Sequence, residues 1–476
     1  MTTGRGLYCN RTLNLRSIRA IGYDMDYTLI HYFVNRWEAC AFSFLKQNLA
    51  ERGVAPAKLA FDPDFAVRGL IVDTELGNLV KADRFGYIKR AAHGTRVLDF
   101  DEQRRTYSRT IVDLGERRWA FLNTLFSLSE ACCYAQLVDA LDAAQIRPGA
   151  SYLDLYRLVR EALDEAHMEG ELKAAILAEP ARFVDDDPLT ARTLLDQREA
   201  GKKLLLVTNS EWFFTNTMMR FAIERHLPSP MRWTELFDLV VVGARKPEFF
   251  LDKQPAFEIV DDSGLMRPVN QLEFNRRYHG ANARQVESLL GLDGAEILYV
   301  GDHIYSDVHV SKAMRRWRTA LVIREIEDEV AAEAEFAPYA RQLAQIMEQK
   351  DHAERALNAE RLALLRLKSG ASSEKRSVEA IKAELEEKRA ELSRLDALAE
   401  PLARSSSHRH HAIWGPLMRS GHDKSHLARQ IERHADIYTS RVSNLAEASP
   451  FAYLRSHGGT LPHDEELPHL DLELAP

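Results

Sequence analysis

The sequence predicts an α/β protein built on an open, doubly wound parallel sheet. Four short apolar segments each end abruptly at polar residues, and helical patterns separate them along the chain. Apolar runs of this length are typical of strands that are buried on both faces, as in a parallel sheet covered by helices. The four segments are SIRAIGYDMD (17–26), KKLLLVTNS (202–210), FDLVVVGARKP (237–247) and AEILYVGDHIYSD (295–307).

The long interval between the first two strands predicts an inserted domain. About 180 residues separate them, whereas an ordinary crossover needs roughly a dozen residues or a little more. We therefore expect a core formed by residues 10–45 and 180–330, with an insertion over 46–179. Within the insertion, 67–91 alternates like a β-hairpin and 151–179 has a helical pattern. The insertion is thus predicted to be an α+β cap above the strand ends.

The C-terminal third has a different composition, rich in Ala, Glu, Lys, Arg and Leu. Residues 331–402 predict an antiparallel helical hairpin that turns at SGASS (369–373). The hairpin would either pack on its own domain or form an oligomer contact. Residues 403–465, with a helical stretch at 424–447, are expected to pack on the core as a helical segment. Residues 466–476 are predicted to be a loose acidic tail.

Composition excludes several classes of function. The 476 residues are 45% hydrophobic and 28% charged, which is typical of a globular protein. The net charge of −8 and the lack of a long basic block disfavour binding to a nucleic-acid polymer. No stretch has the length of apolar sequence that a bilayer requires, and the four cysteines show neither metal spacing nor a disulfide framework. We expect a cytoplasmic protein that binds no membrane.

Four carboxylates are predicted to meet at one edge of the sheet. Asp24 and Asp26 follow the first strand, and Asp302 and Asp307 follow the fourth. Ligands of such sheets bind beyond the carboxyl ends of the strands. A carboxylate cluster is stable there only if a hard cation compensates it or one member is protonated. Mg²⁺, which prefers oxygen ligands and phosphate, fits this set, whereas the spacing fails the Ca²⁺ loop of an EF-hand.

The other two strand ends predict a phosphate site. Thr208, Asn209 and Ser210 supply hydroxyl, amide and backbone N–H groups, and Lys246 supplies a positive charge. A nucleophilic carboxylate, a neighbouring acid, a metal and a phosphate cradle together describe phosphoryl transfer, in which positioning and charge neutralisation do most of the catalysis.

These residues stand in strings that resemble known motifs. DMDYTL, TNS, RKP and GDHIYSD resemble the four motifs of the haloacid dehalogenase (HAD) superfamily of phosphatases. IGYDMDYTLIHY, FLNTLFSLSE, GARKPEFF, ILYVGDHIYSDV and WGPLMRSG resemble the cytosolic purine 5′-nucleotidase family, whose members prefer IMP and GMP, over residues from about 10 to about 465. The resemblance implies an HAD-like core with a cap and Mg²⁺-dependent hydrolysis of purine nucleoside 5′-monophosphates through an aspartyl-phosphate. Because this reaction passes through an aspartyl-phosphate, a nucleoside could replace water as the acceptor. We also expect a homo-oligomer, either a dimer or a tetramer.

The resemblance assigns roles to the carboxylates and the lysine. Asp24 matches the nucleophile, Asp26 the general acid and base, and Lys246 the lysine of the third motif. Asp24, the backbone carbonyl of Asp26 and Asp302 match the Mg²⁺ ligands, and Asp307 matches a supporting carboxylate. Residues 208–210 match the phosphate-binding turn.

The resemblance also places the substrate's base against the cap. Arg160, Asp164 and His167 fall on one face of a predicted helix and match positions that contact the purine. Lys173 matches a lysine near the phosphate, and Phe126 matches the aromatic residue on which the base stacks. From the residues alone, a surface ion pair of Arg160 and Asp164, one helical turn apart, is favoured over contact with a substrate.

Other interpretations stay open at this point. The protein could be a phosphatase for another phosphorylated metabolite, or a non-catalytic scaffold that recruits partners through its hairpin. HRHH (408–411) is expected to be an exposed turn rather than a metal site. Asn123 and Arg318 match parts of a site for activating anions such as ATP, although Ala313 replaces its lysine.

Overall fold

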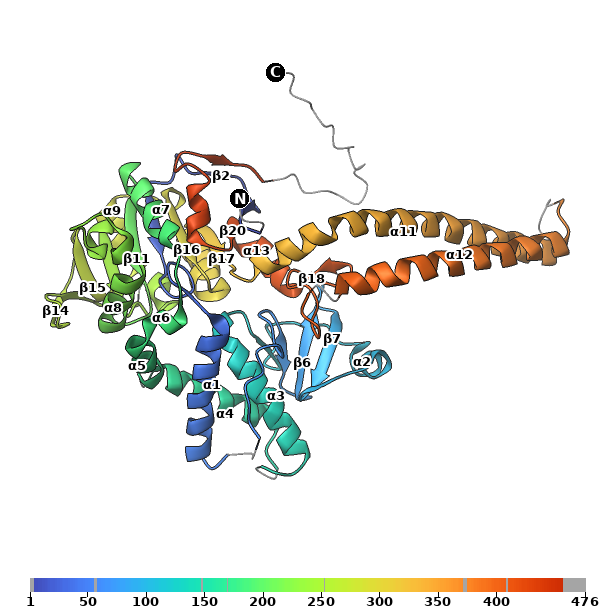
Figure 1. Cartoon of the computed structure of the whole chain (residues 1–476), viewed down its shortest axis with the longest axis horizontal. Helices are drawn as coiled ribbons and strands as arrows, with labels where there is room; N and C mark the ends of the chain where they lie inside the picture. The colour runs from blue at the N-terminus through green and yellow to red at the C-terminus, as the bar shows by residue number, and fades with distance from the viewer. Residues whose placement is uncertain are drawn as a thin grey trace, which may run out of the picture.

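The computed structural model describes residues 4–54, 58–146, 149–168, 170–251, 253–370, 375–407 and 410–456, except for the side chains of 167, 168 and 404–407. A globular body carries one long helical arm (Figure 1). Among the described helices, none is both long enough and apolar enough to cross a membrane.

A ten-stranded sheet forms the centre of the body. The four predicted strands are its neighbours β16 (Ile297–Gly301), β3 (Ala20–Tyr23), β11 (Lys203–Val207) and β12 (Leu239–Val242), all parallel. The predicted doubly wound sheet is therefore confirmed. The sheet continues from β16 through β17 (Arg318–Val322) and β20 (Ile437–Thr439) to β1 (Leu7–Cys9), and from β12 through β15 (Arg276–Gly280) and β13 (Ala256–Ile259) to β14 (Met266–Val269).

Both faces of this sheet are buried. Along β11, Leu204 and Leu206 belong to one apolar cluster, while Leu205 and Val207 belong to another on the opposite face. The helices between the strands supply the cover: α7 (Pro188–Glu199), α8 (Trp212–Ala222), α9 (Ala283–Leu290) and α10 (Val310–Arg315). The helix α7 begins at Pro188, because the side chain of Asp187 caps it and proline occupies its first position.

The cap combines a small sheet with a group of helices. Its antiparallel strands are β5 (Ile71–Asp73), β6 (Asn78–Ala82), β7 (Ile88–His93), β8 (Arg96–Val97) and β9 (Trp119–Phe121). Its helices are α1 (Val34–Glu51), α2 (Phe100–Tyr107), α3 (Leu128–Asp142), α4 (Tyr152–Met168) and α5 (Glu171–Ala178). The predicted boundary at residue 45 falls inside α1, which packs against α4 and α3. We therefore propose that the cap begins after β4 (His31–Tyr32), which pairs with the returning strand β10 (Val184–Asp185).

The arm is an antiparallel pair of helices, α11 (Ile326–Lys368) and α12 (Val378–Ser407), as the sequence predicts. Its seam is apolar and buried, with Ile346 and Leu357 of α11 facing Ile381, Leu385 and Leu395 of α12. At ~1.5 Å per residue, α11 is about 65 Å long. Figure 1 shows the arm extending away from the body over most of this length.

The C-terminal segment differs from the helix predicted over 424–447. Helix α13 covers only His426–His434, and the chain then enters the central sheet as β20. The Asp436 carboxylate between them binds Lys312 at 2.6 Å and Arg318 at 3.0 Å, which anchors the chain beside β17. After β20, strand β21 (Tyr453–Leu454) pairs with β2 (Leu13–Asn14) near the N-terminus.

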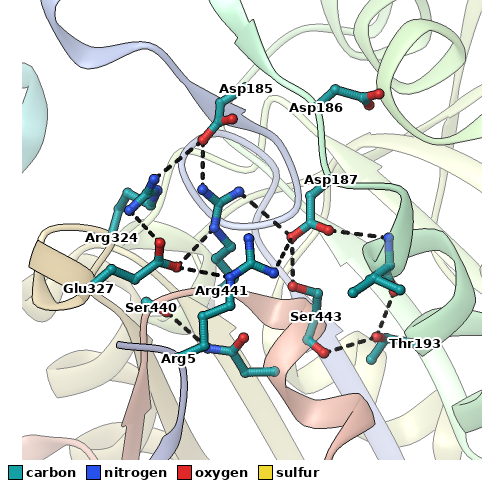
Figure 2. A network of polar contacts seen from close by, with 12 residues as sticks. Arg5, Asp185, Asp186, Asp187, Thr193, Arg324, Glu327, Ser440, Arg441 and Ser443 are labelled. Atoms are coloured by element: carbon teal, nitrogen blue, oxygen red, sulfur yellow. Dashed lines mark hydrogen bonds and ion pairs between the residues drawn. The ribbon is translucent and has the colours of Figure 1, made fainter. Parts of the chain in front are cut away.

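A buried network of charges joins segments that are distant in the sequence (Figure 2). The guanidinium of Arg441 lies 2.7 Å from Asp185 at the return from the cap and 2.9 Å from Glu327 at the start of α11. Arg324 contacts the same two carboxylates, at 3.6 and 2.7 Å, and Arg5 lies 3.6 Å from Glu327. The cap, the arm and both ends of the described chain are therefore fixed to one another here.

Candidate active site

The carboxyl ends of four neighbouring strands bring the predicted residues together. Asp24 follows β3 directly, and its N–H donates to the carbonyl of Val300 on β16. Thr208 follows β11 and donates in the same way to Val241 on β12. Because these strands are parallel and adjacent, their polar ends meet at one edge of the sheet, beneath the cap.

Lys246 is the central cation of the site. Its Nζ lies 2.9 Å from Asp24 Oδ1 and 2.8 Å from Asp307 Oδ1, and donates to the Tyr299 hydroxyl at 3.0 Å. Tyr299 in turn donates to the carbonyl of Val207 at 2.8 Å. Burial raises the pKa of Asp24 to about 6, although Lys246 opposes that shift. The lysine thus offsets much of the negative charge of two carboxylates that have lost their water.

A group of three carboxylates could hold a metal ion. One oxygen each from Asp24, Asp302 and Asp307 lies within 4.8 Å of the other two. Burial, together with the charges of Asp307 and Asp24, raises the pKa of Asp302 well above its usual value. Among the described residues, the buried Oδ2 atom of Asp302 has no hydrogen-bond partner. A hard divalent cation would satisfy this oxygen and compensate the excess negative charge, so the donor set fits Mg²⁺.

The glycine that precedes Asp302 is required by close packing. A Cβ atom on Gly301 would lie 2.4 Å from Oδ2 of Asp307, closer than side-chain carbons approach. The N–H of His303 donates to the same oxygen at 3.1 Å. This turn therefore fixes Asp307 where it reaches both Lys246 and the group of carboxylates.

Asp26 has partners of a different kind. Its Oδ2 accepts a hydrogen bond of 2.6 Å from the Ser210 hydroxyl, and its Oδ1 accepts one of 2.6 Å from the Tyr32 hydroxyl. Burial raises its pKa, and these two hydrogen bonds oppose the shift. The two aspartates of the first motif thus lie in distinct environments: ammonium and carboxylates around Asp24, hydroxyls around Asp26.

The turn after β11 is tied to the lysine that follows β12. Thr208 Oγ1 accepts the N–H of Ser210 at 3.1 Å, which closes the turn. The Asn209 amide accepts the N–H of Lys246 at 2.6 Å and donates to the carbonyl of Lys246 at 3.3 Å. Asn209 therefore positions the lysine backbone, while Ser210 binds Asp26.

Two residues of the cap lie near this edge. Lys173 of α5 has its Nζ 5.4 Å from the centroid of the Phe214 ring, and its charge lowers the pKa of Asp26. The ring of Phe126 packs edge-on against Tyr27 at 4.8 Å and against Trp37 at 5.5 Å. The cap thus places a cation and an aromatic side chain next to the first motif.

Arg160 and Asp164 are paired on the surface of α4. Arg160 lies 3.1 Å from Glu130 of α3 and 3.6 Å from Asp164, so the surface ion pair considered above is present. Both side chains are half-exposed, at 50% and 58%. Burial, with the charges of Lys246, Arg68 and Arg160, lowers the pKa of His303 to about 4. The side chain of His167 lies outside the described residues.

Three residues of the site escaped the sequence-based prediction. Tyr32 and Tyr299 bind Asp26 and Lys246, and the cap residue Arg68 is fully buried, with its Nε 3.4 Å from Glu325. The charge of Arg68 lowers the pKa of Asp302. A tyrosine within the apolar string ILYVG was a usable signal, since a buried phenol needs a hydrogen-bond partner. Nothing in the sequence distinguishes Arg68.

Two secondary expectations concern other regions. Arg318 donates to Asp436 at 3.0 Å and to the carbonyl of Thr12 at 2.8 Å. These bonds give Arg318 a structural role, in addition to its match to a residue of the anion site. In HRHH, His408 and Arg409 lie outside the described residues. Nδ1 of His411 accepts the N–H groups of Ile413 and Trp414, which places it in a turn.

A buried carboxylate lies beside a lysine, and a second carboxylate two residues later is held by hydroxyls, an arrangement suited to a phosphoric monoester hydrolase. The sequence matches the 5′ nucleotidase family over residues 7–466, and the chain belongs to this family.

Known relatives and structures are similar to different extents. A 5′-nucleotidase domain-containing protein of Dictyostelium discoideum is 29% identical over 478 residues, covering 97% of this chain and 75% of that protein. The archaeal β-phosphoglucomutase of a Pyrococcus strain aligns with 13% identity and a TM-score of 0.31, over 64% of this chain and 87% of its own. An HAD phosphatase from Thermococcus onnurineus aligns with 16% identity and a TM-score of 0.27, over 64% and 87%.

Proposed function

We propose that this nucleotidase hydrolyses purine nucleoside 5′-monophosphates, with IMP and GMP as preferred substrates. The observation that carries the proposal is the separation of the two aspartates, one facing Lys246 and the other facing hydroxyls. A carboxylate beside an ammonium group is held ionised and can attack phosphorus, whereas a buried carboxyl bound by hydroxyls can carry a proton.

The reaction follows from these two environments. Asp24 attacks the phosphorus and forms an aspartyl-phosphate, while Asp26 protonates the departing ribose 5′-oxygen. Asp26 then accepts a proton from the water that hydrolyses the aspartyl-phosphate, which restores both carboxyls. Lys246 and the turn at 208–210 neutralise and orient the phosphate. A nucleoside could replace water as the acceptor, which gives phosphotransfer.

Mg²⁺ is the proposed cofactor, and its ligands would be Asp24, Asp302 and the backbone carbonyl of Asp26, supported by Asp307. When bound, it supplies positive charge that draws the phosphate and the nucleophile together. The unpartnered buried oxygen of Asp302 supports this assignment.

The cap is proposed to select the base. Phe126 offers an aromatic surface for the purine, and Lys173 offers a cation for the phosphate. Arg160, Asp164 and His167 would bind the edge of a 6-oxopurine, which requires Arg160 to exchange its bond to Asp164 for the substrate. Recognition by hydrogen bonds to the 6-oxo edge would disfavour adenine.

The test is a substrate panel of nucleoside monophosphates and sugar phosphates, with and without Mg²⁺. We expect kcat/KM to be highest for IMP and GMP, and we expect Asp24→Asn to abolish turnover. Faster hydrolysis of sugar phosphates than of IMP would instead favour the second candidate, a phosphatase for another metabolite. Asp164→Ala separates the two: base selectivity falls under the first proposal and stays unchanged under the second.

We further propose a cytoplasmic enzyme. All four cysteines are free thiols, and Cys132 and Cys133 are buried. Free thiols are typical of a reducing compartment.

A further inference from the structure

A cavity of about 700 Å³ lies between the cap, the base of the arm and the segment 410–417. Its walls come mainly from the segments 32–36, 63–68, 324–329 and 410–417. This volume falls within the range of about 300–1,000 Å³ that is typical of small-molecule sites. The described lining includes none of the three carboxylates that could hold a metal ion, so the cavity is separate from the candidate active site.

Three side chains in the wall have buried polar atoms without a hydrogen-bond partner among the described residues. These atoms are Nε and Nη1 of Arg68, both carboxylate oxygens of Glu325, and Nε2 of His411. Arg68 is only 2% exposed, and its Nε lies 3.4 Å from Glu325 as an ion pair without hydrogen-bond geometry. Since buried polar groups in native proteins are nearly always hydrogen-bonded, these atoms indicate a ligand that supplies the missing partners.

The three side chains present a defined pattern of donors and acceptors. Arg68 can only donate, and the carboxylate of Glu325 can only accept. Nδ1 of His411 accepts the N–H groups of Ile413 and Trp414, and burial lowers the pKa of this histidine. The ring is therefore neutral, and its Nε2 carries the proton and donates. The pattern fits a ligand that has an acceptor and an N–H donor side by side, and a further acceptor elsewhere.

Charge and shape narrow the class of ligand. Three arginines and four acidic residues are among the described lining residues, so the cavity has no excess of positive charge to hold an anion such as a nucleotide. Apolar side chains complete the wall, including Val34, Val67, Leu125 and Leu128, and such a lining suits a flat ring. A nucleobase carries an acceptor beside an N–H donor, and the sugar of a nucleoside adds hydroxyl oxygens that accept hydrogen bonds.

We propose that this cavity binds an uncharged nucleoside, with the carbonyl of its base on Arg68 and the N–H of its base on Glu325. The choice of a nucleoside among molecules of this chemistry rests on the proposed function, because a nucleoside is the product of that reaction. The cavity adjoins the active site through Tyr32, which lines it and whose hydroxyl binds Asp26. A bound nucleoside would therefore lie against the residue that orients the proposed general acid.

The first test fills the cavity. Isothermal titration with inosine uses the full chain carrying Asp164→Ala, which impairs the proposed base site of the cap. One inosine per chain should bind with a Kd below about 1 mM. Adding Val67→Trp should weaken binding at least about tenfold, whereas Leu265→Trp, which adds the same ring to an exposed loop, should leave it unchanged. Circular dichroism checks that the variants are folded.

Binding that persists in the Val67→Trp variant would overturn the proposal. The absence of binding to the parent chain at concentrations up to about 5 mM would overturn it as well. The titration involves no turnover, whereas the proposed hydrolysis is tested by the substrate panel. A failure of the cavity site is thus distinguishable from a failure of the proposed function.

The second test examines the hydrogen bonds. The analogue 1-methylinosine, which lacks the N–H group of the base, should bind at least about tenfold more weakly than inosine. Glu325→Gln should weaken inosine binding at least about fivefold, because an amide oxygen accepts less strongly than a carboxylate. Asp328→Asn is the matched control, since this acid lines the same cavity but has no part in the proposed contact. Equal affinities for the two nucleosides, or equal effects of the two substitutions, would refute the assigned contacts.

Discussion

The hydroxyl of Tyr32 donates a hydrogen bond of 2.6 Å to Oδ1 of Asp26, six residues earlier in the chain. Tyr32 belongs to β4, the strand at which the chain leaves the core for the cap. Tyr32 therefore orients the proposed general acid and also belongs to the strand pair at which the chain enters and leaves the cap.

We expect Tyr32→Phe to lower kcat about 10- to 100-fold with little change in KM. A hydrogen bond to a charged, buried carboxylate contributes about 1.5–3 kcal/mol, and its loss leaves Asp26 less constrained. Without this donor the pKa of Asp26 should rise further. The step in which Asp26 accepts a proton from water requires its ionised form, so this step should need a higher pH.

Tyr27→Phe is the matched control for this variant. The ring of Tyr27 packs in the same aromatic group, with its centroid 5.3 Å from that of Tyr32, but its hydroxyl has no hydrogen-bond partner in the described part of the chain. Steady-state kinetics across pH compares the two. An equal loss of kcat in both would show that packing, not the hydrogen bond, explains the effect.

Lys246→Met should remove catalysis almost completely. Asp24 and Asp307 would then face each other without the ammonium group that lies within 3 Å of both, and their ionised forms would be disfavoured. We expect kcat/KM to fall at least about 10³-fold, as for the loss of a main electrostatic group. Tyr299→Phe, which removes only one partner of Lys246, should cost far less. A larger loss in Tyr299→Phe would contradict the central role of the lysine.

Glu38→Gln should stabilise the protein at pH 8 and change it little at pH 5. Burial raises the pKa of Glu38, in α1, to about 7 from 4.5. The folded state therefore keeps a proton that the unfolded state releases, and stability falls as pH rises from about 4.5 to about 7. The shift corresponds to about 3 kcal/mol, which glutamine, having no proton to lose, would recover above pH 7. Urea unfolding at both pH values measures it; equal gains at pH 5 and pH 8 would contradict the assignment.

Arg441→Ala should destabilise the fold by about 3–5 kcal/mol. Arg441 is buried, and its removal leaves Asp185 and Glu327 short of a cation in a low-dielectric environment. Arg192→Ala is the control, because Arg192 forms an exposed pair with Asp196 at 4.0 Å and should change stability by less than about 0.5 kcal/mol. Denaturant unfolding compares them, and a similar small effect for both would show that the network contributes little.

The strand ends were predictable because their pattern is local. Asp24, Thr208, Lys246 and Asp302 each end an apolar run, and the parallel sheet then brings them together without further information. β20 was not predictable in this way. Three residues cannot show a period, and the strand exists because Asp436 binds Lys312 and Arg318, more than a hundred residues earlier.

The same limit applies to the site. Ser210 could be placed from the turn in which it lies, but its bond to Asp26 spans 184 residues. Arg68 reaches the neighbourhood of Asp302 only because the cap folds back over the core. Contacts that form only through tertiary packing have no characteristic spacing in the sequence, so they could not be predicted from it.

The outer strand β1 pairs with β20, so Leu7 lies opposite Thr439. During synthesis, the first described strand must therefore wait for nearly the last described strand before it can join the sheet. Between these two events the growing chain has an incomplete edge on the side of β17, which is open to water or to other chains. The sheet can therefore be completed only after the segment that contains β20 has been synthesised, whatever the internal parts have folded by then.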